Sequence, residues 1–283
     1  RENSVIRSTC KNNTPQLIET RFGKLFFFHA PLLEQRAIAR ALRAVQDARE
    51  ARLRELALER ERKAALMEQL FTLGTRGEAT KMTEIGEMPE SWILIGLDKI
   101  IIDGPQNGIY KPLELYGSGT QIIRIDVFNN DGLFINTDFK RVILSLEEIE
   151  NYKVNKNDII INRVNSLSHL GKSALISDLR ETCVFESNMM KFHANEGKVY
   201  PEFLWRYLIT NDNKNRIRNM AKRAVAQSSI NQGDVKSLRI PLPKIDEQQE
   251  INKVLSDFDF KISALENEAR LHDELFLAIA RRS

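Results

Sequence analysis

The sequence predicts an α+β fold in which a strand-rich globular domain is flanked by two long helices that pair as a coiled coil. Residues 34–73 contain neither Gly nor Pro, as expected of one uninterrupted helix. From about residue 246 to 281, apolar residues recur at alternating spacings of four and three, which indicates a helix that packs against another helix. Between them, residues 92–192 hold short β-branched runs separated by turn signals.

Length and composition limit the number of domains and the class of protein that the chain can form. The chain has 283 residues, 42% of them hydrophobic, enough for one sizeable domain with appendages or for two small domains. No apolar run approaches the roughly 18 residues of a membrane span. Cys10 and Cys183 do not make a disulfide framework, so we expect a cytoplasmic protein. The formal net charge of +3 is weak evidence for nucleic acid, and the placement of the charges matters more.

The first long helix is predicted over residues 34–74. Forty residues rich in Ala, Leu, Glu and Arg would extend about 60 Å, and Gly74 is a natural C-terminal stop. Arg49 and Arg52 interrupt its apolar seam, which favours a packed long helix over an ideal coiled coil.

The second long helix is predicted over residues 244–283. Eight of the nine positions in its seam are apolar, and His272 is the polar one, expected to pack at the edge of the seam. The first helix is the obvious partner. The residues predicted to mediate pairing are Ile38, Leu42, Val45, Leu56, Ile251, Leu255, Phe258, Ile262 and Leu265.

The region between the helices reads as a linker followed by a domain. Residues 75–91 are polar and punctuated by Gly and Pro, as a linker would be. The domain is predicted over residues 92–243. Its strands include "TQIIRIDVF" and "DIIINRV", and residues 201–225 turn helical from Pro201 in the first turn.

A phrase is repeated in the chain. Glu34, Gln35, Ile38 and Leu42 recur 213 positions later as Glu247, Gln248, Ile251 and Leu255. At the same offset, "TPQLIETRFGKLFFF" (14–28) lies over "QSSINQGDVKSLRIP" (227–241) without a gap. Residues 1–33 are therefore predicted to be the tail of an incomplete first copy of the domain, and the repeat implies a full order of domain, helix, domain, helix.

Four phrases in this order resemble the specificity (S, HsdS) subunit of type I restriction–modification systems. They are "GEMPESW" (86–92), "NDIIINRVNSLSHLGKSALI" (157–176), "AQSSINQGDVKSLRIPLPKIDEQQEI" (226–251) and the repeated Glu-Gln phrase. Each phrase is degenerate alone, and together they cover most of residues 14–280. The departure from the family pattern is the missing body of the first recognition domain. Either the chain is a fragment or truncated form, or two chains assemble as a homodimer that restores two domains.

The resemblance implies a non-catalytic subunit for DNA recognition. Each target recognition domain would read one half of a bipartite site in double-stranded DNA, and the two helices would pair antiparallel and set the distance between the half-sites. One turn of B-DNA separates half-sites by about 34 Å. Methyltransferase (M) and restriction (R) subunits would supply the chemistry. S-adenosylmethionine, ATP and Mg are expected only in those partners, with no cofactor in this chain.

Three stretches offer the residues that contact phosphates and base edges. Each has an ordinary alternative: a polar hairpin loop for the first, a solvated helix face for the second and a simple turn for the third. The first, "INRVNSLSHLGKS", contributes Arg163, Asn165, Ser166, Ser168, His169 and Lys172. The second, "NKNRIRNMAKRAVAQSSIN", contributes Lys214, Arg216, Arg218, Lys222, Arg223, Gln227, Ser228 and Ser229. The third, "PQNGIYKP", contributes Gln106, Asn107, Tyr110 and Lys111.

Other motifs predict little. Gly171-Lys172-Ser173 ends like a phosphate-binding loop, but Ser166 stands where that loop requires Gly. The four His and two Cys lack metal-ligand spacing, and no catalytic motif is present. Two other classes stay open: a helical adaptor with no DNA-reading activity, and an enzyme such as a nucleotide hydrolase that uses the Gly-Lys-Ser loop. Salt-dependent DNA binding and ATP-binding calorimetry would distinguish them.

Overall fold

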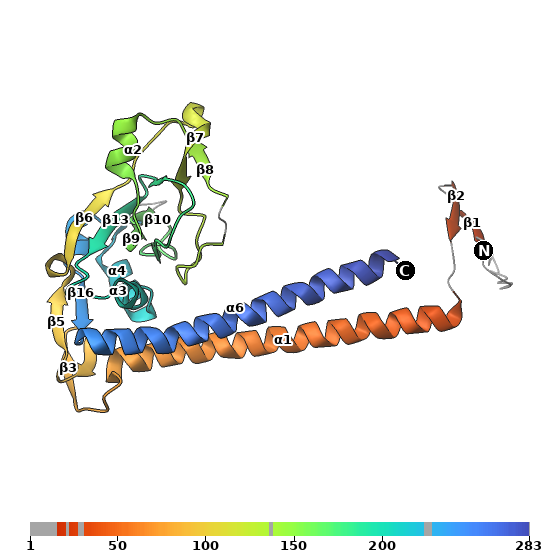
Figure 1. Ribbon diagram of the computed structural model, residues 1–283, viewed down its shortest axis with the longest axis horizontal. Coiled ribbons are helices and arrows are strands. Elements are labelled where there is room, and N and C mark those ends of the chain that lie inside the picture. Colours follow the sequence, from red (N-terminus) through yellow and green to blue (C-terminus); the bar gives the residue numbers. More distant parts are fainter. Residues whose placement is uncertain (1–15, 21–22, 28–30, 136–137, 224–227, 283) are drawn as a thin grey trace. The chain divides into compact units, whose positions relative to one another are not determined.

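The computed structural model describes residues 16–20, 23–27, 31–135, 138–223 and 228–282 (Figure 1). It confirms the α+β class. The chain divides into a helical unit, which holds the chain up to Arg62 and from Phe258 onward, and a globular unit of residues 63–257. Two long helices contribute to both units, α1 (Leu32–Leu73) and α6 (Ile245–Arg282). None of the helices in the described part combines the length and apolarity needed to cross a membrane.

Helix α1 ends where the sequence predicts. Gly74 adopts φ +63°, a left-handed conformation that glycine reaches without strain, and its N–H donates to the Leu70 carbonyl across 3.1 Å. A Cβ at this position would lie 2.7 Å from Glu247 Oε1, so close packing also favours glycine here.

In the helical unit, α1 and α6 run antiparallel. Leu56 of α1 and Ile262 and Leu265 of α6 form a small buried cluster. Ion pairs flank this cluster and join progressively earlier residues of α1 to later residues of α6, which requires opposite directions. These pairs are Arg60–Glu266, Arg52–Glu268 and Arg49–Asp273.

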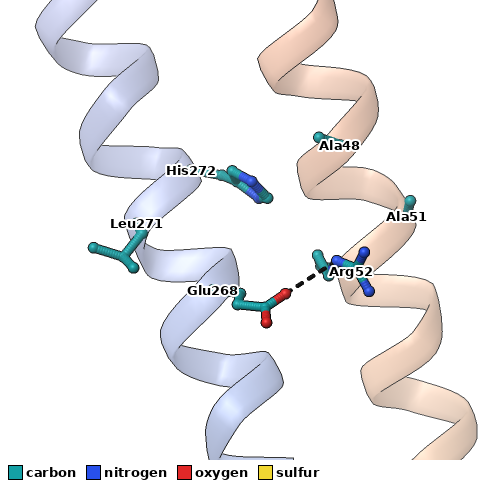
Figure 2. Close-up of a pocket in the computed structure, with 6 residues that line it drawn as sticks. All are labelled: Ala48, Ala51, Arg52, Glu268, Leu271 and His272. Atoms are coloured by element: carbon teal, nitrogen blue, oxygen red, sulfur yellow. Dashed lines mark ion pairs between the residues drawn. The ribbon is translucent and has the colours of Figure 1, made fainter.

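The seam of this helix pair contains polar residues, which explains why its apolar spacing is irregular. Figure 2 shows His272 of α6 directed toward α1 near Ala48, and the Arg52–Glu268 ion pair beside it. The short alanine side chains opposite His272 leave a shallow hollow in the helical unit. Two turns further along the pair, the buried Glu59 accepts from Lys261 Nζ across 2.8 Å, and this interaction lowers the pKa of Glu59.

Four antiparallel strands, in the order β11-β9-β13-β6, form the central sheet of the globular unit. Every residue of β9, the run "DIIIN", is buried, because both faces of the sheet are covered. Ile159 and Ile161 belong to one apolar core and Ile160 belongs to another, so alternate side chains of one strand fill opposite layers. The strands are β6 (Ile101–Asn107), β9 (Asp158–Asn162), β11 (Ser173–Leu175) and β13 (Met189–Ala194).

A second sheet has the order β12-β7-β8 and mixes a parallel with an antiparallel pair. This sheet has a buried apolar cluster of its own, to which each strand contributes one residue: Ile122, Val142 and Val184. Helix α2 lies beside it and is fixed by a capping box between Ser145 and Glu148. The elements are β7 (Tyr116–Ile123), β8 (Lys140–Val142), β12 (Cys183–Phe185) and α2 (Leu146–Tyr152).

The largest core joins the sheet to the helices. Phe203 of α3 (Pro201–Leu208) packs against Phe71 near the end of α1, with ring centroids 5.2 Å apart, and edge-on against Trp92 at 6.3 Å. Ile251 and Leu255 of α6 are fully buried in this same core. These two predicted pairing residues therefore hold α6 to the globular unit, whereas Ile38, Leu42, Val45 and Phe258 are half-buried.

The predicted helix over residues 201–225 is two helices followed by a strand. The hydroxyl of Thr210 donates to the Tyr207 carbonyl and accepts from the Asn213 N–H, so it ends α3 and caps a new helix. Pro201 begins α3, as predicted. The new elements are α4 (Asn211–Met220) and β14 (Lys222–Arg223).

Residues 75–91, predicted as a linker, are largely folded. Strands β3 (Thr80–Thr83) and β4 (Gly86–Pro89) form a hairpin, and Met88 inserts its side chain into the main core. The remaining elements are β5 (Ile93–Gly96), η1 (Leu97–Lys99), η2 (Leu113–Leu115), β10 (Val164–Asn165), β15 (Ser228–Ser229), α5 (Gln232–Lys236) and β16 (Arg239–Leu242), with β16 paired to β5.

The predicted tail of a first domain differs from its counterpart in backbone conformation. Strands β1 (Gln16–Thr20) and β2 (Gly23–Phe27) form a hairpin, whereas the positions 213 residues later form β15, α5 and the start of β16. Helix α5 begins with a capping box between Asn231 and Asp234. Ile18 and Arg21 stand at the matching positions, and neither side chain can make that pattern. The rest of residues 1–30 lies outside the described residues.

Candidate nucleic-acid interface

Two of the three predicted DNA-contacting stretches meet in one small sheet of the globular unit. Its strand order is β10-β15-β14. Ser229 lies opposite Val164 on one side and Lys222 on the other, and Ser228 lies opposite Asn165 and Arg223. We call β10, β15, β14 and the adjoining loop 166–169 the three-stranded surface. Residues more than 55 positions apart in the sequence are thereby brought within one ladder spacing, about 5 Å.

The loop 166–169 is organised by its own polar side chains. Ser166 Oγ lies 2.9 Å from His169 Nδ1 and 3.0 Å from Ser168 Oγ, and the Asn165 side chain accepts from the Ser166 N–H across 2.8 Å. Ser166, Ser168 and His169 remain exposed, and Asn165 is half-buried. The loop therefore presents hydroxyl, amide and imidazole groups in a fixed arrangement.

Gly171 and Arg218 bring this loop against α4. Gly171 has φ +75°, and a Cβ there would lie 2.7 Å from the Ile217 side chain. Arg218 donates to the Ser168 carbonyl across 3.1 Å and to Asn215 Oδ1 across 3.1 Å. Arg218 is half-buried at the edge of the three-stranded surface, and Lys222 beyond it is exposed.

Lys172 is not on this surface. Its ammonium lies inside the globular unit, where it donates to the carbonyls of Ile125 and Phe128 and lies 4.5 Å from the Phe128 ring centroid. Burial lowers the pKa of Lys172. The structure therefore removes Lys172 from the predicted phosphate contacts, because its charge is already solvated by the protein.

Lys214 and Arg216 are also used internally. Lys214 is buried and donates to the Asn130 carbonyl across 2.6 Å, and burial lowers its pKa. Arg216 donates to the Tyr207 hydroxyl across 3.0 Å and to the Ile85 carbonyl. Of the five charges predicted between residues 214 and 223, Lys214 and Arg216 are therefore used inside the fold, and Arg218 bonds the loop 166–169. Only the backbone of Arg223 is described, and Gln227 lies outside the described residues.

The third stretch, residues 105–112, divides between internal and exposed positions. Gln106 donates to the Asn151 carbonyl across 2.8 Å, and Lys111 forms an ion pair with Glu148. This pair and the Ser145 N–H lower the pKa of Glu148. Asn107 and Tyr110 are exposed, on either side of Gly108 and Ile109. Tyr110, with 76% of its surface exposed, offers a free aromatic face.

A hollow of about 390 Å³ adjoins the three-stranded surface. Asn107 and Arg163 line it together with residues 231–233, which the sequence analysis did not include among the DNA-contacting candidates. The signal that could have found them is the polar "NQG" run that begins two residues after the predicted Ser229. Among the described residues, no three His, Cys, Asp or Glu side chains gather as metal ligands.

The family comparison matches most of the globular unit and part of α6. The model of the "Type I restriction modification DNA specificity domain" covers residues 106–273. A Methanocaldococcus jannaschii protein described as the MjaX specificity subunit of a type I restriction enzyme is 36% identical over 66% of this chain and 44% of its own length. The StySPI specificity subunit of Salmonella potsdam is 28% identical over 78% of this chain and 47% of its own. The chain thus spans about half the length of the curated relatives it matches.

Solved structures share the fold. The HsdS subunit from Thermoanaerobacter tengcongensis matches with a TM-score of 0.51 at 18% identity, over 92% of this chain and 60% of that one. The type I restriction–modification S subunit from M. genitalium matches with a TM-score of 0.58 at 15% identity, over 93% and 66%. The family match, which covers more than half of the sequence, is the stronger finding. The chain belongs to the family of type I restriction–modification DNA specificity domains.

Proposed function

We propose that this chain is a sequence-specific DNA-recognition subunit of a type I restriction–modification complex. The observation that carries the proposal is the three-stranded surface, where two separate polar and basic stretches converge. A small ribbon that presents Asn, Ser and Lys side chains has the chemistry that contacts both phosphates and base edges.

Within this surface, the residues divide by chemistry. Lys222 is exposed and Arg218 lies at the edge, so they are assigned to backbone phosphates. Asn165 and Ser229 occupy β10 and β15 and are assigned to groove contacts. Arg223 is also assigned to backbone phosphates, because it follows Lys222 in β14.

The helical unit is proposed to dock the methyltransferase subunits, and the restriction subunit joins through the complex. Large apolar side chains on α6 support this role, since they remain exposed although the seam faces α1: Phe260, Leu271, Leu275 and Leu277. S-adenosylmethionine, ATP and Mg would act in those partners, and this chain would carry no catalytic role.

The repeated Glu-Gln phrase supports reading of a bipartite site. At its second occurrence, Gln248 is fully buried, accepts from the Tyr200 N–H across 2.7 Å and donates to the Pro243 carbonyl across 2.9 Å. Glu247 beside it is buried, whereas its counterpart at the first occurrence, Glu34, is exposed. We propose that the start of α1 holds a second recognition domain, supplied by another copy of this chain in a homodimer.

Genome-wide mapping of N6-methyladenine tests these proposals. The chain would be expressed with its methyltransferase subunit in a bacterium without other adenine methylation. A gapped palindromic motif is the expected result, because two identical domains would read two identical half-sites. An asymmetric gapped motif would overturn the homodimer and keep DNA recognition. If both proteins are expressed and no adenine in the genome is methylated, the alternative function, a helical adaptor without DNA-reading activity, would be favoured.

A further inference from the structure

The hollow beside the three-stranded surface is built from three segments that are distant in the sequence. Asn107 ends β6, Arg163 lies between β9 and β10, and Gln232 begins α5. Asn107 and Gln232 are exposed, and Arg163 is half-buried. None of the residues that line the hollow carries a carboxylate.

Backbone hydrogen bonds fix these segments to one another. The Arg163 N–H donates to the Asn188 carbonyl across 2.8 Å, and the Arg163 carbonyl accepts from the Ile230 N–H across 2.9 Å. The second bond places the start of α5 against Arg163. Asn107 lies opposite Met190 in the central sheet, next to the Met189–Asn162 pair.

Gly108 allows the chain just after β6 to pass close to the backbone of Phe185 and Glu186. A Cβ at Gly108 would lie 2.3 Å from the Glu186 carbonyl oxygen, and its own N–H donates to the Met189 carbonyl across 3.1 Å. Any larger residue would displace the backbone that carries Asn107. Asn107 and Arg163 are therefore held by the backbone of the central sheet, and residues 231–233 belong to the capped start of α5, which suits a site that must hold side chains in place.

The guanidinium of Arg163 is oriented but only partly used. Nη1 donates to the Ser187 carbonyl across 3.1 Å, whereas the buried Nε has no hydrogen-bond partner among the described residues. An oriented guanidinium is suited to guanine O6 and N7, and a glutamine or asparagine amide is suited to adenine N6 and N7.

We propose that Asn107, Arg163 and Gln232 form the base-reading pocket of the globular unit, with Gln232 reading the adenine of an A·T pair in the major groove. This inference rests on the proposed function. The three-stranded surface continues directly into the pocket, because β10 follows Arg163 and β15 precedes Ile230. Phosphate contacts on that surface would hold the duplex while the pocket reads its edge.

Selection from a random double-stranded DNA pool by the chain–methyltransferase complex tests the pocket. Gln232→Ala should relax the preference for adenine at one motif position by about 5- to 150-fold and leave the other positions unchanged. Gln232→Glu should shift that position toward cytosine, whose N4 amino group donates to a carboxylate. Gln232 is exposed, so both variants are expected to fold.

Lys236→Ala is the matched control, since Lys236 is an exposed residue of the same helix that does not line the hollow. It should leave the motif unchanged. An unaltered motif for Gln232→Ala, or a uniform loss across all sequences, would overturn the pocket while the wild-type motif still supports DNA recognition. If the wild-type complex enriches no motif, the proposed function fails first and the pocket with it.

Discussion

The indole N–H of Trp92 donates a hydrogen bond to Glu247 Oε2 across 3.1 Å, although 155 positions separate the two residues. The other oxygen of the same carboxylate accepts from the Thr75 N–H across 2.9 Å. One buried side chain therefore joins the end of α1, the segment between β4 and β5 and the start of α6. The carboxylate thus links the chain just after α1 to the first turn of α6 within the globular unit.

Replacing Glu247 with Ala should destabilise the globular unit by about 2–3 kcal/mol. The change leaves the buried indole N–H of Trp92 without its acceptor and removes the bond from the Thr75 N–H, and hydrogen bonds to a buried carboxylate are costly to lose. Urea denaturation followed by tryptophan fluorescence measures the effect. Glu34→Ala, at the repeated position, is the control and should shift the free energy of unfolding by less than about 0.5 kcal/mol, because Glu34 is exposed. Equal effects of the two changes would contradict this role.

Leu265→Glu should separate the helices of the helical unit. Leu265 is buried with Leu56 and Ile262, and a carboxylate there would be desolvated without a partner. Hydrogen exchange should show faster amide exchange around residues 52–60 of α1. Leu275→Glu is the matched control, because 48% of Leu275 is exposed. Unchanged protection in Leu265→Glu would show that this cluster does not hold the pair together.

Lys222→Ala should weaken DNA binding by similar factors for all sequences and reduce the slope of log K against log salt by about one. Lys222 is exposed on β14, where a phosphate contact releases one counterion. Fluorescence anisotropy measures DNA binding by the complex at salt concentrations from about 50 to about 200 mM, and these measurements give the slope. Lys156→Ala serves as control, since that exposed ammonium pairs with Asp178 at 2.8 Å and lies outside the three-stranded surface. A slope equal to wild type would argue against the assignment.

Glu186 and Glu148 should contribute to stability with opposite pH dependence. Burial raises the pKa of Glu186, so the native state holds its proton longer than the unfolded state, and stability should fall as pH rises from the unfolded pKa, about 4.5, through the folded one. The Lys111 ammonium lowers the pKa of Glu148, so its contribution is present above the unfolded pKa and lost as pH falls through the folded value. Urea unfolding of Glu186→Gln and Glu148→Gln, each compared with wild type from about pH 3 to 7, should give differences of opposite slope. Parallel slopes would refute the assignment.

The elements predicted correctly are those with long or dense patterns. Helices α1 and α6, the stop at Gly74 and the buried strand β9 follow from composition, spacing and apolar density. The break at Thr210 was not predicted, although Thr210 and the Asn and Asp residues that follow it are typical of a helix N-terminus. The Thr210 hydroxyl both ends α3 and caps α4.

The candidate interface could be predicted in composition but not in arrangement. Strands β10, β14 and β15 have two residues each, too few to show an alternating pattern, so their meeting is a product of the tertiary fold. Sequence also does not separate Lys222, which is exposed, from Lys214, which is buried only eight positions earlier. The difference depends on whether a free carbonyl, here that of Asn130, lies within reach.

Lys172, Lys191 and Lys214 have a consequence for chemical labelling. Each is buried and donates its ammonium to backbone carbonyls. Acylating reagents require a neutral, accessible amine, so these three lysines should react only when the surrounding segments open. Mass spectrometry of the acylated sites would then give the rate at which the central sheet and its neighbours open locally. The acylation rate of the exposed lysines in the same molecule would serve as the internal reference.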